Sequence, residues 1–202
     1  QGVIGRVLFA RVFGGSYLPD WHPWEDYRCG YSANASMGGG CVLDGIHEID
    51  LAQWYVGEVK TVAAMVSQIS SLELDVEDVA SIILQHVGGQ HSEVHLDYVQ
   101  RARVRGCLVA GTEGSIAWDW SEHQVRWYRA DQGRWSEEPL PANWHVNQMY
   151  VDEMDHFLQC VLSRRATCNP VVEAAAVNRI ALAAKRSSHE RRFVDLPVEV
   201  IT

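Results

Sequence analysis

Polar and apolar residues alternate through the middle of the chain, which predicts β-strands there. Residues 79–87 and 92–98 are two such runs, and a Gly-Gly pair between them suits a tight hairpin turn. Two more turn-forming stretches follow at 111–114 and 121–123. Because parallel strands need long crossover connections, consecutive short turns predict an antiparallel sheet over about 59–128.

Strands and helices are also predicted toward the two ends of the chain. Residues 3–13 are rich in β-forming side chains and predict a first strand, and 192–200 predict a last one. Helical spacing of apolar residues predicts helices over 41–56, 150–162 and 171–185. In the second of these helices the apolar residues form a single stripe, which we expect to face the core.

These elements together predict one domain over residues 1–202, with no internal repeat. We expect an α+β fold: a mostly antiparallel open sheet with its helices on one face. The other face of the sheet is polar enough to line a cleft or to meet a partner.

A long loop over about 16–37 separates the first strand from the first helix. Loops of this length are usually functional or disordered, and its aromatic content favours an ordered, functional loop. Its aromatic and cationic side chains could form a wall that holds a sugar and a phosphate. They could equally belong to a loop that packs on its own aromatic residues. The side chains in question are Trp21, His22, Tyr27 and Arg28.

Charge and cysteine content restrict the possible partners and the compartment. The 17 basic and 26 acidic residues give a net charge of −9 without a basic block, which argues against nucleic acid or an anionic membrane as the partner. No apolar run approaches the roughly 20 residues of a membrane span. The five cysteines are scattered, so we expect reduced thiols in a cytoplasmic protein. The chain starts without Met or a signal layout, and we interpret it as the interior of a longer protein.

Asp44 and His47 are the strongest chemical candidates. Residues three apart on one helix project from the same side, so the carboxylate could orient the imidazole. An imidazole held in this way can move a proton to or from a substrate near neutral pH. Asp-x-x-His is also common on helices, and the spacing alone favours a surface pair with no chemical task.

Two further sets of side chains alternate along predicted strands. His91, Glu93 and His95 could ligate zinc, but a wet sheet surface or a subunit contact is the simpler interpretation, and we predict no metal site. Three arginines could clamp a phosphate, although the pattern favours a solvated or interfacial strand face. They are Arg101, Arg103 and Arg105.

Residues 38–57, GGGCVLDGIHEIDLAQWYVG, resemble the signature of the C-terminal domain of the Gfo/Idh/MocA oxidoreductase family. That family includes glucose–fructose oxidoreductase, inositol dehydrogenase and nucleotide-sugar dehydrogenases. The resemblance extends along nearly the whole chain in matching order. It includes the loop 16–28, Glu77-Asp78 before a strand, Gly111-x-x-Gly114, Asn147-x-x-Tyr150-x-x-Glu153 and the segment 183–188.

The resemblance implies roles for individual residues. His47 matches the family's active-site histidine, which acts as acid or base on the reacting hydroxyl. Asp44 matches the acidic residue one turn earlier, which orients that histidine or touches the substrate. Many members space these two residues by four positions and this chain by three, as in one subgroup. Asp50 matches a position that we expect to be structural.

The resemblance also implies that one domain of the family's enzymes is absent from this chain. The family's N-terminal Rossmann domain carries a Gly-x-Gly-x-x-Gly turn and a Glu-Lys-Pro lysine, and neither motif occurs here. Gly38-Gly39-Gly40 lacks the strand–turn–helix context of a pyrophosphate cradle. We therefore expect no cofactor-binding residues in this chain, and the chain alone to be inactive. NAD or NADP would be bound mainly by the domain absent from it.

Two functions from different classes follow. The first is the substrate-binding half of an NAD(P)-dependent oxidoreductase acting on a sugar, nucleotide sugar or polyol, assembled as a homo-oligomer through the sheet face. The second is a stand-alone binding or dimerisation module that kept the fold but not the reaction. The sequence upstream of Gln1 discriminates between them, since a Gly-x-Gly-x-x-Gly turn there would favour the oxidoreductase.

Overall fold

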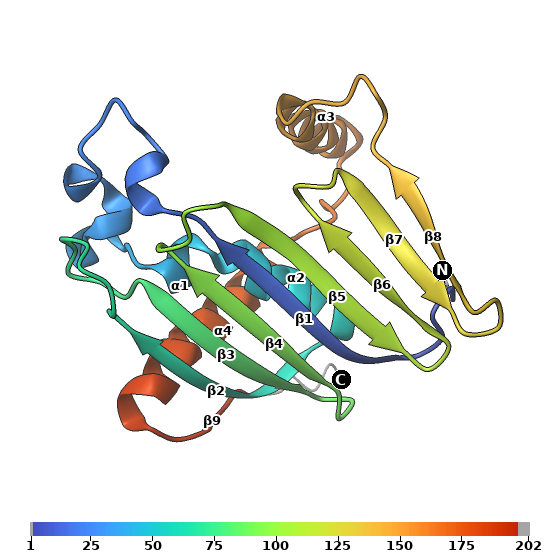
Figure 1. Ribbon diagram of the computed structural model, residues 1–202, viewed down its shortest axis with the longest axis horizontal. Helices are drawn as coiled ribbons and strands as arrows, with labels where there is room; N and C mark the ends of the chain where they lie inside the picture. Colours follow the sequence, from blue (N-terminus) through green and yellow to red (C-terminus); the bar gives the residue numbers. More distant parts are fainter. Residues whose placement is uncertain (1, 198–202) are drawn as a thin grey trace.

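An open β-sheet forms the centre of the molecule (Figure 1). The computed structural model describes residues 2–197. Within them nine strands lie in the order β8-β7-β6-β5-β1-β4-β3-β2-β9. Their bounds are β1 Val7–Gly15, β2 Val59–Ser67, β3 Val79–His86, β4 His91–Asp97, β5 Val104–Gly111, β6 Gly114–Asp119, β7 Gln124–Arg129, β8 Arg134–Pro139 and β9 Val194–Asp195.

Neighbouring strands are antiparallel with one exception, which confirms the predicted sheet type. The hairpin turn between β3 and β4 lies at the predicted glycine pair, where Gly89 has a φ of +84°. The exception is β1, which pairs with β4 in parallel and with β5 antiparallel. A parallel neighbour is possible here because the long stretch 16–90 separates the two strands and carries the chain across the sheet.

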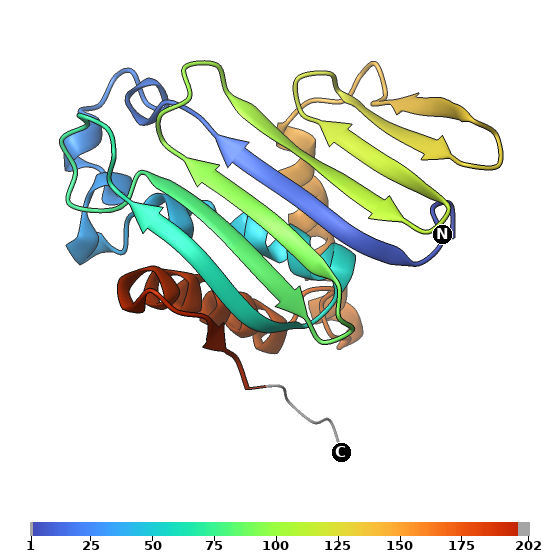
Figure 2. The same cartoon turned by 60° about the horizontal axis from the view of Figure 1, so that its bottom comes forward.

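The helices lie on one side of the sheet and leave its other broad face open (Figure 2). This arrangement confirms the predicted α+β class. α2 contacts β1, and α4 packs along β2. The helices are α1 Cys41–Asp44, α2 Ile46–Val56, α3 Asn147–Ser163 and α4 Val171–Glu190, and four short 3₁₀ turns lie between Leu18 and Met37.

The hydrophobic core fills the space between the sheet and the helices α1, α2 and α4. Residues of β3 alternate between the core and solvent, with Ile82 buried and Ile83 exposed. Ile49 of α2 and Ile180 of α4 are buried against the same side of the sheet. The core therefore fixes the orientation of α2, which carries the predicted histidine.

The predicted helix 41–56 is interrupted at Gly45, where α1 ends and α2 begins. A Cβ at Gly45 would lie 2.8 Å from Cδ2 of Leu96 and 2.7 Å from the carbonyl oxygen of Cys41. Glycine thus allows the chain to pass close to β4 as it changes direction. As a result Asp44 and His47 lie on two different helices.

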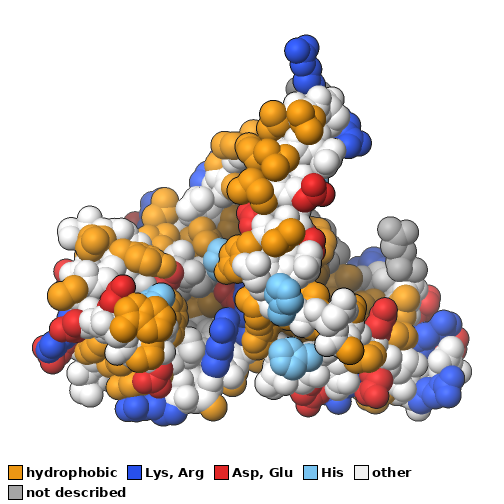
Figure 3. All heavy atoms as spheres, turned by 90° about the horizontal axis from the view of Figure 1, so that it is seen from above, with side chains coloured by type: hydrophobic (Ala, Val, Ile, Leu, Met, Phe, Trp, Pro, Cys, Tyr) orange, Lys and Arg blue, Asp and Glu red, His pale blue; other side chains and the backbone are white. Residues whose placement is uncertain are grey.

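α3 departs most from the sequence-based expectation. Its apolar stripe was expected to face the core, and this prediction is wrong: Tyr150, Phe157 and Leu162 are 61%, 51% and 78% exposed. Figure 3 shows hydrophobic side chains gathered along the helix that projects from the body of the molecule. Helical periodicity reveals that one face is apolar but not what covers that face.

The remaining differences concern the ends of the chain. β1 begins four residues later than predicted, at Val7, and β9 covers Val194–Asp195. Residues 198–200 of the predicted last strand lie outside the described residues. Within residues 2–197, none of the helices combines the length and the apolar composition that crossing a membrane requires.

Candidate active site

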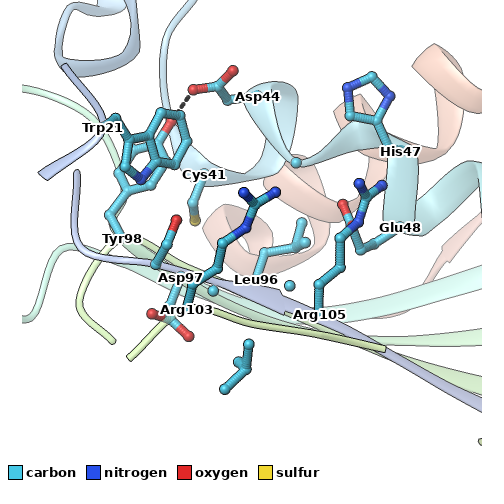
Figure 4. A pocket seen from close by; sticks show the side chains of 15 residues that line it. Trp21, Cys41, Asp44, His47, Glu48, Leu96, Asp97, Tyr98, Arg103 and Arg105 are labelled. Carbon is cyan, nitrogen blue, oxygen red and sulfur yellow. Dashed lines mark hydrogen bonds and ion pairs between the residues drawn. The ribbon is translucent and has the colours of Figure 1, made fainter. Parts of the chain in front are cut away.

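Two adjoining cavities open beside the junction of α1 and α2. The inner cavity, of about 140 Å³, lies between this junction and the ends of β1, β4 and β5, and Asp44 and His47 both line it (Figure 4). The outer cleft, of about 570 Å³, is lined by the loop after β1, by the segment before β5 and by Tyr150 of α3. Trp21 and Arg103 line both cavities, so the two form one continuous site.

Three hydroxyl groups hold the Asp44 carboxylate. Its oxygens accept hydrogen bonds from the hydroxyls of Tyr31 at 2.7 Å, Ser32 at 2.7 Å and Tyr98 at 2.9 Å. Burial and the negative charge of Asp44 raise the pKa of Tyr98 well above its ordinary value, so this phenol stays a neutral donor. The carboxylate is therefore fixed by groups other than His47.

His47 lies in the first turn of α2 and is exposed. Among the described residues its ring has neither a hydrogen bond nor an ion pair, and Figure 4 shows it beside the inner cavity, away from the Asp44 carboxylate. The direct contact expected between the two residues is absent because Gly45 separates their helices. Both side chains nevertheless line the same cavity, and the imidazole is free to meet a substrate.

Next to His47, an ion pair between a buried carboxylate and a partly buried guanidinium forms part of the cavity wall. Glu48 is 4% exposed, and its Oε1 accepts a hydrogen bond of 2.6 Å from Nε of Arg105 in β5. Sequence reasoning missed Glu48. The available signal was a charged residue between Ile46 and Ile49, on the part of the helix that turns toward the core.

Asp97, at the end of β4, is fully engaged by its neighbours. It accepts hydrogen bonds from the ring of His95 at 3.0 Å, from the side chain of Gln100 at 2.8 Å and from two backbone N–H groups. Burial alone would raise the pKa of Asp97, but these hydrogen bonds outweigh it and lower the pKa. Asp97 therefore lines the inner cavity as an ionised group whose oxygens are already occupied.

The structure brings only part of the predicted loop wall to the site. Trp21 and His22 line the outer cleft, and the Trp21 ring meets Tyr98 edge-on at 5.4 Å between centroids. Tyr27 and Arg28 line neither cavity. The Tyr27 hydroxyl accepts a hydrogen bond of 3.1 Å from the N–H of Glu73.

The guanidinium of Arg28 is held by two carboxylates at the surface. It lies 2.7 Å from Asp26 and 3.2 Å from Glu73. Its positive charge is therefore paired at the surface, outside both cavities.

The glycine-rich start of α1 does not fit a pyrophosphate group. The N–H groups of Cys41 and Val42 donate to the backbone and side-chain oxygens of Glu77, at 3.1 and 3.3 Å. A Cβ at Gly40 would lie only 2.4 Å from the Glu77 carboxylate, which in turn binds Lys185 of α4 at 2.8 Å. A carboxylate thus occupies the place that a phosphate would need, and α1 is only four residues long.

The strand residues considered as metal ligands have other partners. Glu93 forms an ion pair of 2.7 Å with Arg11, and His95 bonds Asp97. Among the residues that the structure describes, no group of three His, Cys, Asp or Glu side chains is arranged to hold a metal ion. Asp50 lies on α2 and lines a small cavity between α2 and α4, outside the inner cavity.

Solved structures share this fold along almost the whole chain. Levoglucosan dehydrogenase in complex with NADH superposes with a TM-score of 0.86 at 20% identity, covering 98% of this chain and 60% of that one. An aldose-aldose oxidoreductase from Caulobacter crescentus, complexed with glycerol, gives 0.81 at 22% identity, covering 96% and 57%. An oxidoreductase from Agrobacterium radiobacter, in complex with NAD+, L-tartaric acid and magnesium, gives 0.77 at 21%, covering 96% and 58%.

These neighbours are longer proteins, since this chain spans about 60% of their length. Curated protein sequences give no match. The family model of the GFO/IDH/MocA C-terminal domain matches residues 1–117, which is more than half of the chain. The chain therefore belongs to the Gfo/Idh/MocA family of oxidoreductases.

Proposed function

We propose that this chain is the substrate-binding part of an NAD(P)-dependent oxidoreductase that acts on a sugar, a nucleotide sugar or a polyol. One observation carries the proposal: the unpaired imidazole of His47 stands beside a cavity that also presents a fixed carboxylate, Asp44. Oxidation of an alcohol requires a proton to leave oxygen while a hydride leaves carbon. The imidazole of His47 can take that proton.

Asp44 contributes a carboxylate that is held in a fixed position at the cavity. Its carboxylate is held by Tyr31, Ser32 and Tyr98, so it can accept a hydrogen bond from a substrate hydroxyl without moving. It acts on the substrate directly rather than by orienting His47. Trp21 and His22 form the side of the site against which the ring of a sugar packs.

The hydride acceptor, NAD or NADP, is supplied from outside this chain. Glu77 fills the start of α1, so the glycine-rich segment has no free amides for a pyrophosphate. Structural neighbours named for NAD or NADH complexes are longer than this chain, which supports a nucleotide-binding part elsewhere in the complete enzyme. We expect the chain alone to bind NADH weakly and to turn over no substrate.

The proposal is tested by replacing His47 in the complete enzyme and following nicotinamide reduction with a panel of sugars and polyols. His47→Asn should lower kcat by about 10² to 10⁴, the usual contribution of a general base, while KM changes little. His145→Asn removes an exposed histidine outside both cavities and should leave both constants unchanged. A lack of nicotinamide-dependent oxidation across the panel would count against the oxidoreductase and favour a stand-alone binding module. If oxidation is found but survives in His47→Asn, the role of His47 is wrong.

We also propose a homo-oligomer formed through the open face of the sheet, and a cytoplasmic location. The open face carries exposed apolar side chains, including Met65 and Ile83. All five cysteines are free thiols, which fits a reducing compartment.

A further inference from the structure

Two arginines line the outer cleft without an acidic partner. Arg101 and Arg103 form no ion pair within the described part of the chain, and Arg103 also lines the inner cavity. Figure 4 shows Arg103 and Arg105 rising from the strand layer toward the helices. Arg105 differs from its neighbour because its charge is neutralised by Glu48 at 2.6 Å.

An aromatic ring lies next to each of the two guanidinium groups. The central carbon of the Arg101 guanidinium lies 3.6 Å from the centroid of the Tyr17 ring. That of Arg103 lies 5.5 Å from the centroid of the Trp120 ring. Stacking on an aromatic face restrains a guanidinium but leaves the N–H groups at its edge free to donate. The cleft therefore contains two guanidinium groups with unused hydrogen-bonding capacity, of which Arg101 is stacked on Tyr17.

The carboxylates of the inner cavity are bound to residues other than Arg101 and Arg103. Asp44 is held by three hydroxyls, Glu48 by Arg105, and Asp97 by His95 and Gln100. The outer cleft is lined by one carboxylate, that of the exposed Asp20, and by the two guanidinium groups. The outer cleft therefore carries more guanidinium groups than carboxylates, whereas the inner cavity carries three carboxylates and two guanidinium groups, in a chain whose net charge is −9.

We propose that the substrate is an anionic sugar, with a carboxylate or phosphate bound by Arg103 and Arg101. This inference rests on the proposed function, since it assigns the reacting part of the sugar to the inner cavity. Arg103 stands where the two cavities meet, so the anionic group lies at the end of the molecule remote from the hydroxyl at His47. Planar guanidinium groups suit both anions because two parallel N–H groups match two oxygens.

Calorimetric titration of the chain tests the proposal with four probes: D-glucose, D-gluconate, D-glucose 6-phosphate and inorganic phosphate. At least one anionic sugar should bind about tenfold or more tightly than glucose, the fold-change expected for one charge-assisted hydrogen bond. Comparison of gluconate with the sugar phosphate distinguishes the two anions. Binding should weaken as salt is added.

Variants assign the effect to the two arginines. Arg103→Gln should remove about tenfold or more of the affinity for the anionic sugar and lower that for glucose by a clearly smaller factor. Arg101→Gln should act in the same direction, and Arg103→Lys, which keeps the charge but loses the planar fork, should lie between. Arg134→Gln removes an exposed guanidinium from β8, outside both cavities, and serves as the matched control.

The outcomes separate this inference from the proposed function. Equal binding of glucose and both anionic sugars, unchanged in Arg103→Gln, would overturn the anionic substrate while a sugar site stands. Inorganic phosphate binding as tightly as the sugar phosphate would also overturn it, because the anion would then be bound without the sugar. No binding of any sugar would count against the proposed function as well.

Discussion

Buried polar side chains in this protein are matched to partners at the level of single residues. The Glu77 carboxylate meets Lys185 and the N–H of Val42, Glu48 meets Arg105, and the partly buried Asp44 meets three hydroxyls. Breaking such a pair leaves a buried charge without a partner, which costs more than the intact pair contributes. These contacts therefore fix where the side chains around the inner cavity stand.

His86 shows how one such group links stability to pH. The ring is 1% exposed, with Nδ1 donating to the Gly57 carbonyl at 2.7 Å and Nε2 accepting from the Ser92 hydroxyl at 2.8 Å. Burial lowers the pKa of His86 below its ordinary value, and the hydrogen bond to Gly57 only partly opposes this. The unfolded chain, with a pKa near 6.5, then binds a proton more readily than the folded chain.

We predict that the free energy of unfolding falls as the pH drops below about 6.5, by at most about 1.4 kcal/mol per pH unit for this proton. Stability is complete above the unfolded pKa and is lost toward the lower folded pKa. Urea unfolding between about pH 7.5 and 5.5 measures the slope. His86→Gln should reduce the dependence of the unfolding free energy on pH. His145→Gln changes an exposed histidine and should leave this dependence unchanged. An unchanged slope in His86→Gln would contradict the assignment.

Sequence reasoning named some of the residues that line the two cavities and missed others for physical reasons. Asp44 and His47 belong to a continuous signature, and both line the inner cavity. The pattern favoured a solvated or interfacial strand face for Arg103, because its position at the cleft depends on the course of the segment before β5. Arg28 looked like a ligand-binding cation, since no local pattern revealed that Glu73, far along the chain, would neutralise it.

At the scale of elements, the periodicity of apolar residues predicted where helices and strands lie along the sequence. It did not predict which other elements they pack against. The hairpin β3–β4 and the span of α2 follow from local patterns of apolar residues and glycines. The parallel pairing of β1 with β4 does not, because it joins segments separated by most of the first half of the chain. The break at Gly45 depends likewise on a tertiary contact with Leu96.

α3 and α4 should respond differently to the loss of a large apolar side chain. Ile180 of α4 is 1% exposed, and Ile180→Ala should lower the free energy of unfolding by about 2–5 kcal/mol. Phe157 of α3 is 51% exposed, and Phe157→Ala should cost less than about 1 kcal/mol. Urea unfolding of the two variants at neutral pH gives both values. Equal losses would mean that the apolar face of α3 is covered in solution.

At the scale of the whole molecule, the helices protect one face of the sheet and leave the other open (Figure 2). Across the open face, Ile83 of β3 is 53% exposed, beside an ion pair between Glu93 of β4 and Arg11 of β1. Apolar side chains around a paired set of charges suit contact with a second copy, since the same surface must be complementary to itself. A site built on the helix side would then remain open in the assembly.

This arrangement predicts an oligomer that a single charge on the open face disrupts. Light scattering of the chain at about 100 μM, well above the Kd of a stable interface, should give a dimer or larger species. Ile83→Lys should shift it toward monomer without unfolding it, because Ile83 is exposed within one copy and a lysine in an apolar interface is costly. Leu182→Lys places the same charge on α4, where Leu182 is 57% exposed, and should leave the assembly intact. A wild-type monomer at this concentration would refute an interface at the sheet face, and so would an Ile83→Lys protein that stays assembled. Dissociation by Leu182→Lys alone would place the contact on the helix side.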